Sequence, residues 1–215
     1  IVRTRPDLAS LISNIEEFNA DGNYLFSIMR GFRLEKLLFR LLDEKEFLSE
    51  FGIRSLSKYH EKHPFVFQHN GYHQIQYESG ESRSNMFGGN SNWRGPIWMP
   101  LNYMIIQSLR KYYLFYGKEY VYEFPTGSGV KLNLNEIANE ISKRLIKLFQ
   151  PNKNGKFQYH SEDKHQLFTK DEQFKNQHFF YEFFDGDSGK GLGASHQTGW
   201  TALVANLIME LEENS

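Results

Sequence analysis

Apolar side chains recur every three or four positions along several separate stretches of the chain. This spacing places them on one face of an α-helix and predicts amphipathic helices. The pattern covers 7–18, 33–43, 96–116 and 198–212, and a further helix begins after Asn133 or Asn135, either of which can cap it, and ends before Pro151. The sequence therefore predicts long helices joined by long loops.

One stretch between these helices has a different period. Residues 65–78 read F-V-F-Q-H-N-G-Y-H-Q-I-Q-Y-E, with apolar and polar residues alternating on either side of Asn70-Gly71. Alternation is typical of a β-strand, and Asn-Gly is a favoured hairpin turn. We predict a small β-hairpin inserted between helices.

Composition excludes several classes of function. The 215 residues include 25 basic and 26 acidic side chains, so no net charge attracts the chain to nucleic acid or to an anionic membrane. No apolar run is long enough to cross a bilayer. The absence of cysteine excludes a disulfide framework and leaves the compartment open. Since the first residue is Ile1, we expect the chain to be a piece of a longer polypeptide.

Residues 87–98 form the first of two unusual loops, with the sequence F-G-G-N-S-N-W-R-G-P-I-W. Glycines, amides, an arginine and two tryptophans are concentrated just before a long helix. Planar rings and a guanidinium suit a polar, ring-shaped ligand on a loop. The alternative is a structural turn in which Pro96 starts the helix and Trp93 and Trp98 lie in the core.

The second loop spans 179–200 and contains a carboxylate among aromatic residues. Glu182 has five aromatic neighbours in sequence, where an ionised carboxylate is costly unless it is exposed, hydrogen-bonded or paired. One interpretation is a strand whose alternate residues face water. The other is a carboxylate on the wall of an aromatic cleft that activates a water molecule.

The other polar residues of the second loop do not predict a specific function. Asp185 and Asp187 resemble a metal-binding pair, but the later acidic residues of a calcium loop are missing, so we predict no metal and no other cofactor. His196 is either a general base or metal ligand, or a residue that hydrogen-bonds or caps the following helix.

Together the two loops resemble the carboxy-terminal part of glycoside hydrolase family 63, which includes processing α-glucosidase I, other α-glucosidases and mannosylglycerate hydrolases. The resemblance is carried by G-G-N-S-N-W-R-G-P-I-W and by F-Y-E-F-F-D-G-D-S-G-K-G-L-G-A-S-H-Q-T-G-W-T-A-L-V-A. The stretch 47–63, E-S-G-E-S from Glu78 and P-T-G-S-G from Pro125 are similar to its bacterial-type branch.

The resemblance implies an all-α fold, the (α/α)6 barrel. Residues 1–215 would be the C-terminal portion, about half, of a single catalytic domain that carries the β-hairpin as an insertion. The remaining half of that domain is then an expected partner, in contact with an exposed apolar face of this chain.

The resemblance also implies inverting hydrolysis of an α-glycosidic bond, with an oligosaccharide, a disaccharide or a small glycoside as substrate. In that chemistry one carboxylic acid protonates the leaving oxygen while a second carboxylate activates water. The general base corresponds to Glu182. The expected substrate-binding residues, by motif position, are Trp93, Arg94, Trp98, His196, Gln197 and Trp200.

The family's general acid is an aspartate in a segment of the E-S-G-x-D-x-S type, which the sequence does not contain. E-S-G-E-S-R-S at 78–84 differs from it, and the role does not transfer to Glu81. We expect the acid on a segment upstream of Ile1. The alternative is a carbohydrate-binding or regulatory module of the same fold without catalysis.

An ionised general base in aromatic surroundings needs a partner that offsets the energetic cost of removing its charge from water. We hypothesise that Arg94, or a donor from the turn at His196-Gln197, lies near Glu182.

Overall fold

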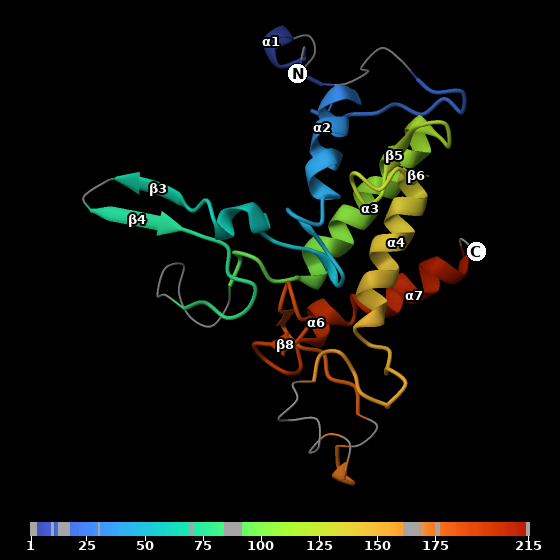
Figure 1. The fold of residues 1–215 in the computed structure, drawn as a ribbon. Coiled ribbons are helices and arrows are strands. Elements are labelled where there is room, and N and C mark those ends of the chain that lie inside the picture. Colours follow the sequence, from blue (N-terminus) through green and yellow to red (C-terminus); the bar gives the residue numbers. More distant parts are fainter. Residues whose placement is uncertain are drawn as a thin grey trace.

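Two long helices form the centre of the protein. The computed structural model describes residues 4–9, 11–12, 18–29, 31–68, 71–83, 92–160, 168, 170–174 and 177–213. Helix α3 (Met99–Tyr116) lies beside α4 (Leu134–Lys147), as Figure 1 shows. Of the two predicted caps, Asn133 is the one that caps α4: its side chain accepts from the backbone of Glu136 while the Glu136 carboxylate accepts from the Asn133 N–H.

Shorter helices pack around this pair. Helix α2 (Gly31–Leu41) confirms the predicted helix at 33–43, and it buries Leu34 and Leu38. The C-terminal helix is interrupted at Ala202, which separates α6 (Thr198–Thr201) from α7 (Leu203–Glu213). Of the helix predicted at 7–18, residues 7–9 belong to α1 (Pro6–Ala9), residues 11, 12 and 18 are not helical, and residues 10 and 13–17 lie outside the described residues.

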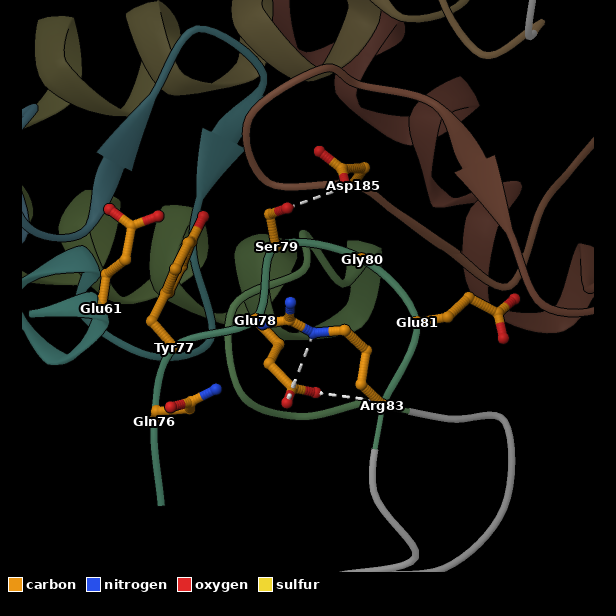
Figure 2. Close-up of a pocket in the computed structure, with 9 residues that line it drawn as sticks. All are labelled: Glu61, Gln76, Tyr77, Glu78, Ser79, Gly80, Glu81, Arg83 and Asp185. Atoms are coloured by element: carbon orange, nitrogen blue, oxygen red, sulfur yellow. Dashed lines mark hydrogen bonds and ion pairs between the residues drawn. The ribbon is translucent and has the colours of Figure 1, made fainter. Parts of the chain in front are cut away.

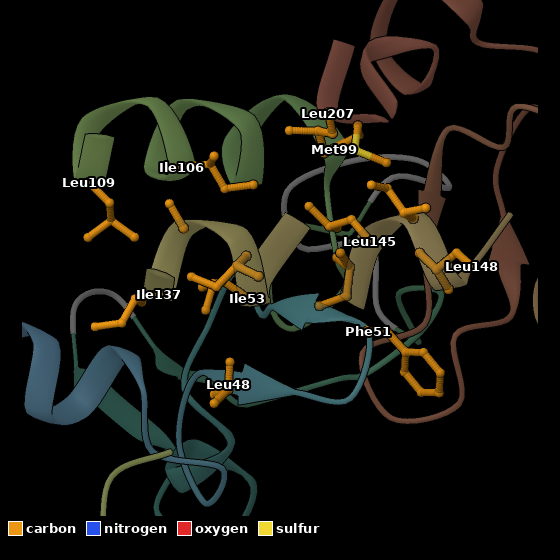
Figure 3. Packing of buried hydrophobic residues seen from close by; sticks show 14 of the residues in the cluster. Leu48, Phe51, Ile53, Met99, Ile106, Leu109, Ile137, Leu145, Leu148 and Leu207 are labelled. Carbon is orange, nitrogen blue, oxygen red and sulfur yellow. The ribbon is translucent and has the colours of Figure 1, made fainter. Parts of the chain in front are cut away.

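The hydrophobic core fills the space between α3, α4, α7 and the chain before η1, a 3₁₀ helix at Lys58–Glu61. Figure 3 shows Ile106 of α3 and Leu145 of α4 among the side chains packed around the two central helices, together with Leu48 and Ile53 from the strands beside α4. These four side chains are at most 1% exposed. Their burial is the main source of stability for the framework that holds the loops.

Four two-stranded antiparallel sheets lie among the described residues. The predicted hairpin is confirmed: β3 (Phe65–Gln68) pairs with β4 (Tyr72–Ile75) in a register that sets Gln68 opposite Tyr72. The other pairs are β1 (Leu48–Ser49) with β2 (Gly52–Ile53), β5 (Val121–Glu123) with β6 (Lys131–Asn133), and β7 (Phe183–Phe184) with β8 (Gly191–Leu192).

The prediction of an all-α (α/α)6 barrel was wrong. The structure is mixed, because short paired strands recur between the helices of the described chain. Two- and three-residue strands have too few positions to give an alternating pattern, so the helical period dominated the prediction. Within the described residues no helix is both long and apolar enough to cross a membrane.

Backbone contacts just before α3 join the first loop to the second loop and to the residue after β2. Ile97 forms bridges with Arg54 on one side and with Phe184 on the other. The buried amide of Asn102 adds to this link, since it accepts from the Ile53 N–H at 2.7 Å and donates to the Ile53 carbonyl at 3.0 Å. The two loops are therefore fixed against the same helix end.

Candidate active site

All three tryptophans of the chain meet at the start of α3. Trp93 stacks on Trp98 with ring centroids 3.9 Å apart and planes 4° apart, and Phe183 stacks on Trp98 at 4.7 Å. The ring centroid of Trp200 lies 5.6 Å from that of Trp98. Trp98 is fully buried, whereas Trp93 is 49% and Trp200 38% exposed. The cluster thus combines a core side chain with two indoles that reach the surface.

Glu182 directly precedes Phe183 of this aromatic cluster in the chain and is half-buried. Its backbone N–H donates to the Ala194 carbonyl at 2.8 Å, and its Oε2 accepts from the Ala194 N–H at 3.2 Å. The chain approaches this carboxylate closely at Gly193, which has a φ of 68°. A Cβ there would lie 2.6 Å from Glu182 Oε2 and 2.9 Å from the Phe183 ring, so glycine leaves room for both side chains.

Arg94 is buried and pairs with a different carboxylate from the one we hypothesised. Its Nη2 donates to Glu78 Oε2 at 3.0 Å, and both side chains are at most 7% exposed. Its Nε donates to Asn92 Oδ1 at 3.2 Å. The Glu182 carboxylate accepts a hydrogen bond from the Ala194 backbone, two residues before His196.

His196 and Gln197 are exposed beside the segment that precedes β7 and carries Glu182. Phe180 and His196 form a parallel bridge, in which the Gln197 N–H donates to the Phe180 carbonyl at 2.7 Å. Gln197 is also the N-cap position of α6, although its side chain makes no cap hydrogen bond. The two residues therefore lie at a helix start that is tied directly to the second loop.

The aspartates of the second loop support its conformation. Asp185 Oδ1 accepts from the backbone N–H groups of Asp187 and Ser188, and its Oδ2 accepts from Ser79 Oγ at 3.0 Å. Asp187 receives hydrogen bonds from Lys58, Arg54 and Tyr77. Among the described residues, no three His, Cys, Asp or Glu side chains are grouped so as to hold a metal ion.

The surroundings of Asp187 shift its pKa and that of its partner Tyr77. Burial opposes its ionisation, but the hydrogen bonds from Lys58 and Tyr77 and the charge of Arg54 outweigh burial and lower the pKa of Asp187. Burial also raises the pKa of the Tyr77 phenol above its ordinary value, so that Tyr77 remains a hydrogen-bond donor at neutral pH. The second loop is thereby anchored to the chain around η1.

A polar pocket of about 390 Å³ opens between the segment 76–83, Glu61 of η1 and Asp185 of the second loop. Figure 2 shows the Ser79 hydroxyl bonded to Asp185 and the Glu78 carboxylate directed toward Arg83. Glu182 is not part of its lining, which consists of Glu61, Gln76, Tyr77, Glu78, Ser79, Gly80, Glu81, Arg83 and Asp185. The pocket is distinct from the surface formed by the tryptophans and Glu182.

Residues 27–123 match the glycosyl hydrolase family 63 C-terminal domain. The chain is a relative of family 63. It is 49% identical over 212 residues to the uncharacterized protein YMR196W of Saccharomyces cerevisiae, covering 98% of this chain and 20% of that protein. It is 27% identical over 178 residues to the mannosyl-oligosaccharide glucosidase of the same yeast, covering 82% of this chain and 15% of the glucosidase.

A plant relative extends the comparison to a second type of glucosidase. Alpha-glucosidase 2 of Arabidopsis thaliana is 24% identical over 162 residues, covering 75% of this chain and 14% of the plant protein. The chain thus spans a fifth or less of the length of these relatives. The resemblance inferred from the two loops is confirmed, and the relatives with named activities are glycosidases.

Sequence reasoning missed three side chains that shape this region. Asn92 hydrogen-bonds Arg94, Phe183 stacks on Trp98, and Glu78 pairs with Arg94 across 16 positions of sequence. The short Asn-Trp-Arg spacing could have indicated a local turn around Asn92. Nothing in the sequence pattern indicates the long-range pairing of Glu78.

Proposed function

We propose that the full-length protein hydrolyses an α-glycosidic bond with inversion and that Glu182 is its general base. The named glucosidase relatives support this class of reaction. In inverting hydrolysis a carboxylate takes a proton from water as the water attacks the anomeric carbon. The sugar leaves as the oxygen of the broken bond receives a proton from a carboxylic acid.

The observation that carries this proposal is that Glu182 directly precedes Phe183 of the tryptophan cluster. Phe183, its neighbour in sequence, stacks on Trp98, and Trp98 in turn stacks on Trp93. The Ala194 N–H orients the carboxylate through Oε2. A base held on rigid backbone next to exposed rings has the two components that a glycosidase needs, a fixed proton acceptor and a surface that binds sugar.

Trp93 and Trp200 are the proposed contacts with the substrate. Sugars present apolar C–H faces that stack on aromatic rings, and both indoles are partly exposed. One face of Trp93 lies against Trp98, so a sugar would stack on the opposite face. His196 and Gln197, which are exposed beside the segment that carries Glu182, are proposed to hydrogen-bond sugar hydroxyls.

We propose that the general acid belongs to a part of the full-length protein outside residues 1–215. The two carboxyl groups of an inverting enzyme stand about 6.5–9.5 Å apart, which leaves space for the water. The acid would therefore approach Glu182 from the side on which the substrate lies against Trp93.

Proton NMR of the first product tests the proposal. The full-length protein is mixed with kojibiose, nigerose or maltose, which contain α-1,2, α-1,3 and α-1,4 bonds between glucose units. The glucose from the reducing end is a mixture of anomers, so the glucose from the non-reducing end carries the information. We expect the released glucose from at least one of these disaccharides to contain at first more β anomer than the equilibrium mixture, and this excess to decay by mutarotation. An initial excess of the α anomer over the equilibrium mixture would contradict inversion. Saturable binding of a disaccharide without any hydrolysis would favour the non-catalytic carbohydrate-binding alternative.

A further inference from the structure

A buried ion pair involves Arg94, the residue that follows Trp93 in the chain. The Glu78 side chain is 6% exposed and the Arg94 side chain 7%, and their charged groups meet at 3.0 Å. Arg94 Nη2 also donates to Ser82 Oγ at 2.5 Å. Because both charges are removed from water, the guanidinium of Arg94 is engaged within the protein rather than presented to a ligand.

Asn92 connects this ion pair to the backbone on both sides of Trp93. Its Oδ1 accepts from the Arg94 N–H at 2.9 Å and from Arg94 Nε at 3.2 Å. Its Nδ2 donates to the Glu78 carbonyl at 2.9 Å and to the Gly80 carbonyl at 2.6 Å. The residues before and after Trp93 are therefore held by one continuous network.

The same network reaches the partner on which Trp93 stacks. Trp98 Nε1 donates to the Asn92 carbonyl at 2.9 Å, so the buried indole is fixed in position as well as packed. The Glu78 backbone adds a second attachment, since its N–H donates to the Arg94 carbonyl at 2.8 Å. Hydrogen bonds thus connect the indole of Trp98, and the backbone on either side of Trp93, to the chain around Glu78.

Close packing leaves this arrangement little freedom. Gly95 follows Arg94 with a φ of 156°, and a Cβ there would lie 2.4 Å from the Glu78 carbonyl oxygen. A buried ion pair contributes little net stability, because desolvation offsets much of the attraction, and its best-attested use is to specify one geometry.

We propose that Glu78 is a positioning residue for the substrate, acting through Arg94 and Asn92 to hold the indole of Trp93 against Trp98. This inference rests on the proposed function, in which Trp93 stacks on the sugar. It also gives Arg94 a positioning role in place of the direct substrate contact expected from its motif. Loss of the Glu78 charge should therefore weaken substrate binding with little effect on the chemical step at Glu182.

A double-mutant cycle in the full-length protein tests the proposal, with the disaccharide that the wild type hydrolyses. We expect Trp93→Ala and Glu78→Gln each to raise KM about tenfold, the order of one lost aromatic stacking contact, with kcat within about threefold of wild type. If Glu78 acts through Trp93, the double variant also shows about a tenfold rise. A rise near a hundredfold, the product of the single effects, would overturn the proposal.

Glu210→Gln is the matched control for losing a partly buried carboxylate. Glu210 pairs with Arg110 between α7 and α3, away from the tryptophan cluster. Its replacement should leave KM within about twofold of wild type, as expected of an ion pair that holds no substrate contact. An equal rise in KM for Glu78→Gln and Glu210→Gln would also overturn the proposal.

Arg94→Lys is the substitute if Glu78→Gln does not fold. It keeps the positive charge but cannot reproduce the fork of hydrogen bonds, and it takes the place of Glu78→Gln in the same cycle.

Acrylamide quenching of tryptophan fluorescence separates this inference from the proposed function. The fluorescence of Trp93 is obtained by subtracting the spectrum of Trp93→Phe from that of the wild type. The same subtraction is made with and without Trp93→Phe in the Glu78→Gln or Arg94→Lys variant. We expect the Trp93 signal to be more strongly quenched when the ion pair is altered. If the wild type hydrolyses no disaccharide, the proposed function fails while an increased quenching still supports the positioning of Trp93. Unchanged quenching overturns the positioning role whether or not the protein is active.

Discussion

Ile97 and Phe184 exchange both backbone hydrogen bonds, at 2.8 and 2.9 Å, and both are fully buried. In this antiparallel register the residue after Ile97 faces the residue before Phe184. Those residues are Trp98 and Phe183, whose rings stack at 4.7 Å. A single pair of backbone contacts therefore aligns the loop that carries Trp93 with the loop that carries Glu182.

Replacement of Gly193 by alanine should disturb Glu182 directly. The new methyl group would meet Glu182 Oε2 at 2.6 Å, in a backbone conformation with φ of 68°. We expect kcat for disaccharide hydrolysis to fall at least tenfold, because displacement of a base from its attacking water is costly. Steady-state kinetics of the full-length protein provide the measurement.

Gly129→Ala is the matched control for that substitution. Gly129 has a similar φ of 76°, but a Cβ there would contact nothing within 4 Å. Both variants carry the cost of a left-handed alanine, about 1 kcal/mol, and only Gly193→Ala adds the steric clash. Equal activity of the two variants would argue against a functional role for the carboxylate beside Gly193.

Asp187→Asn should destabilise the protein in a pH-dependent manner. The folded-state pKa of Asp187 is lowered, so the stabilisation from its ionised form is complete above the unfolded pKa of about 3.9 and is lost as the pH falls through the lower folded pKa. Urea unfolding of wild type and variant is compared in steps from pH 6 to pH 3. We expect a large difference in unfolding free energy at pH 6 and a smaller one at pH 3.

Asp21→Asn provides the reference for loss of an exposed carboxylate. Asp21 lies in an exposed turn near the N-terminus. Its replacement is expected to change the unfolding free energy by less than about 0.5 kcal/mol. A constant difference between wild type and Asp187→Asn across the whole pH range would contradict the electrostatic role of the contacts with Lys58, Arg54 and Tyr77.

The helical framework could be predicted from sequence because its signals are local. The end of α3 at Gly117 and the cap of α4 at Asn133 follow from residue types that act within one turn. The hairpin of β3 and β4 was predicted for the same reason. The break at Ala202 was not, because the apolar stripe continues from α6 into α7 and gives no sign of the interruption.

The candidate site was only partly predictable. The two loops were identified from their composition and from their resemblance to family 63, and the structure brings their aromatic residues together. The partner of Arg94 was not predictable, because Glu78 and Glu182 are both carboxylates at long range and the choice between them depends on tertiary packing. The pairing of Ile97 with Phe184 likewise has no local sequence signal.

An apolar groove between α2 and α3 leads to a prediction about the isolated chain. The groove encloses about 510 Å³ and is lined mainly by apolar residues. Leu37 is 44% and Met104 60% exposed at its rim. Apolar surface of this kind is normally covered, so we expect isolated residues 1–215 to self-associate and Met104→Lys to increase the monomer fraction in sedimentation velocity.

Phe65→Lys serves as the control for removing one exposed apolar side chain. Phe65 is 57% exposed on the hairpin of β3 and β4 and does not line the groove. It should increase the monomer fraction less than Met104→Lys does. A monodisperse monomer of the unmodified chain would contradict the expectation that another part of the full-length protein covers this groove.

The most direct test of the central claim is the kinetics of Glu182→Gln in the full-length protein. Glutamine preserves the size of the side chain but cannot take a proton from water. We expect kcat for disaccharide hydrolysis to fall about a thousandfold, within the usual contribution of a general base, while KM changes less than about threefold. The thermal unfolding midpoint, measured in parallel, should stay close to that of the wild type. Turnover near the wild-type value in a folded Glu182→Gln variant would contradict the assignment of Glu182 as the general base.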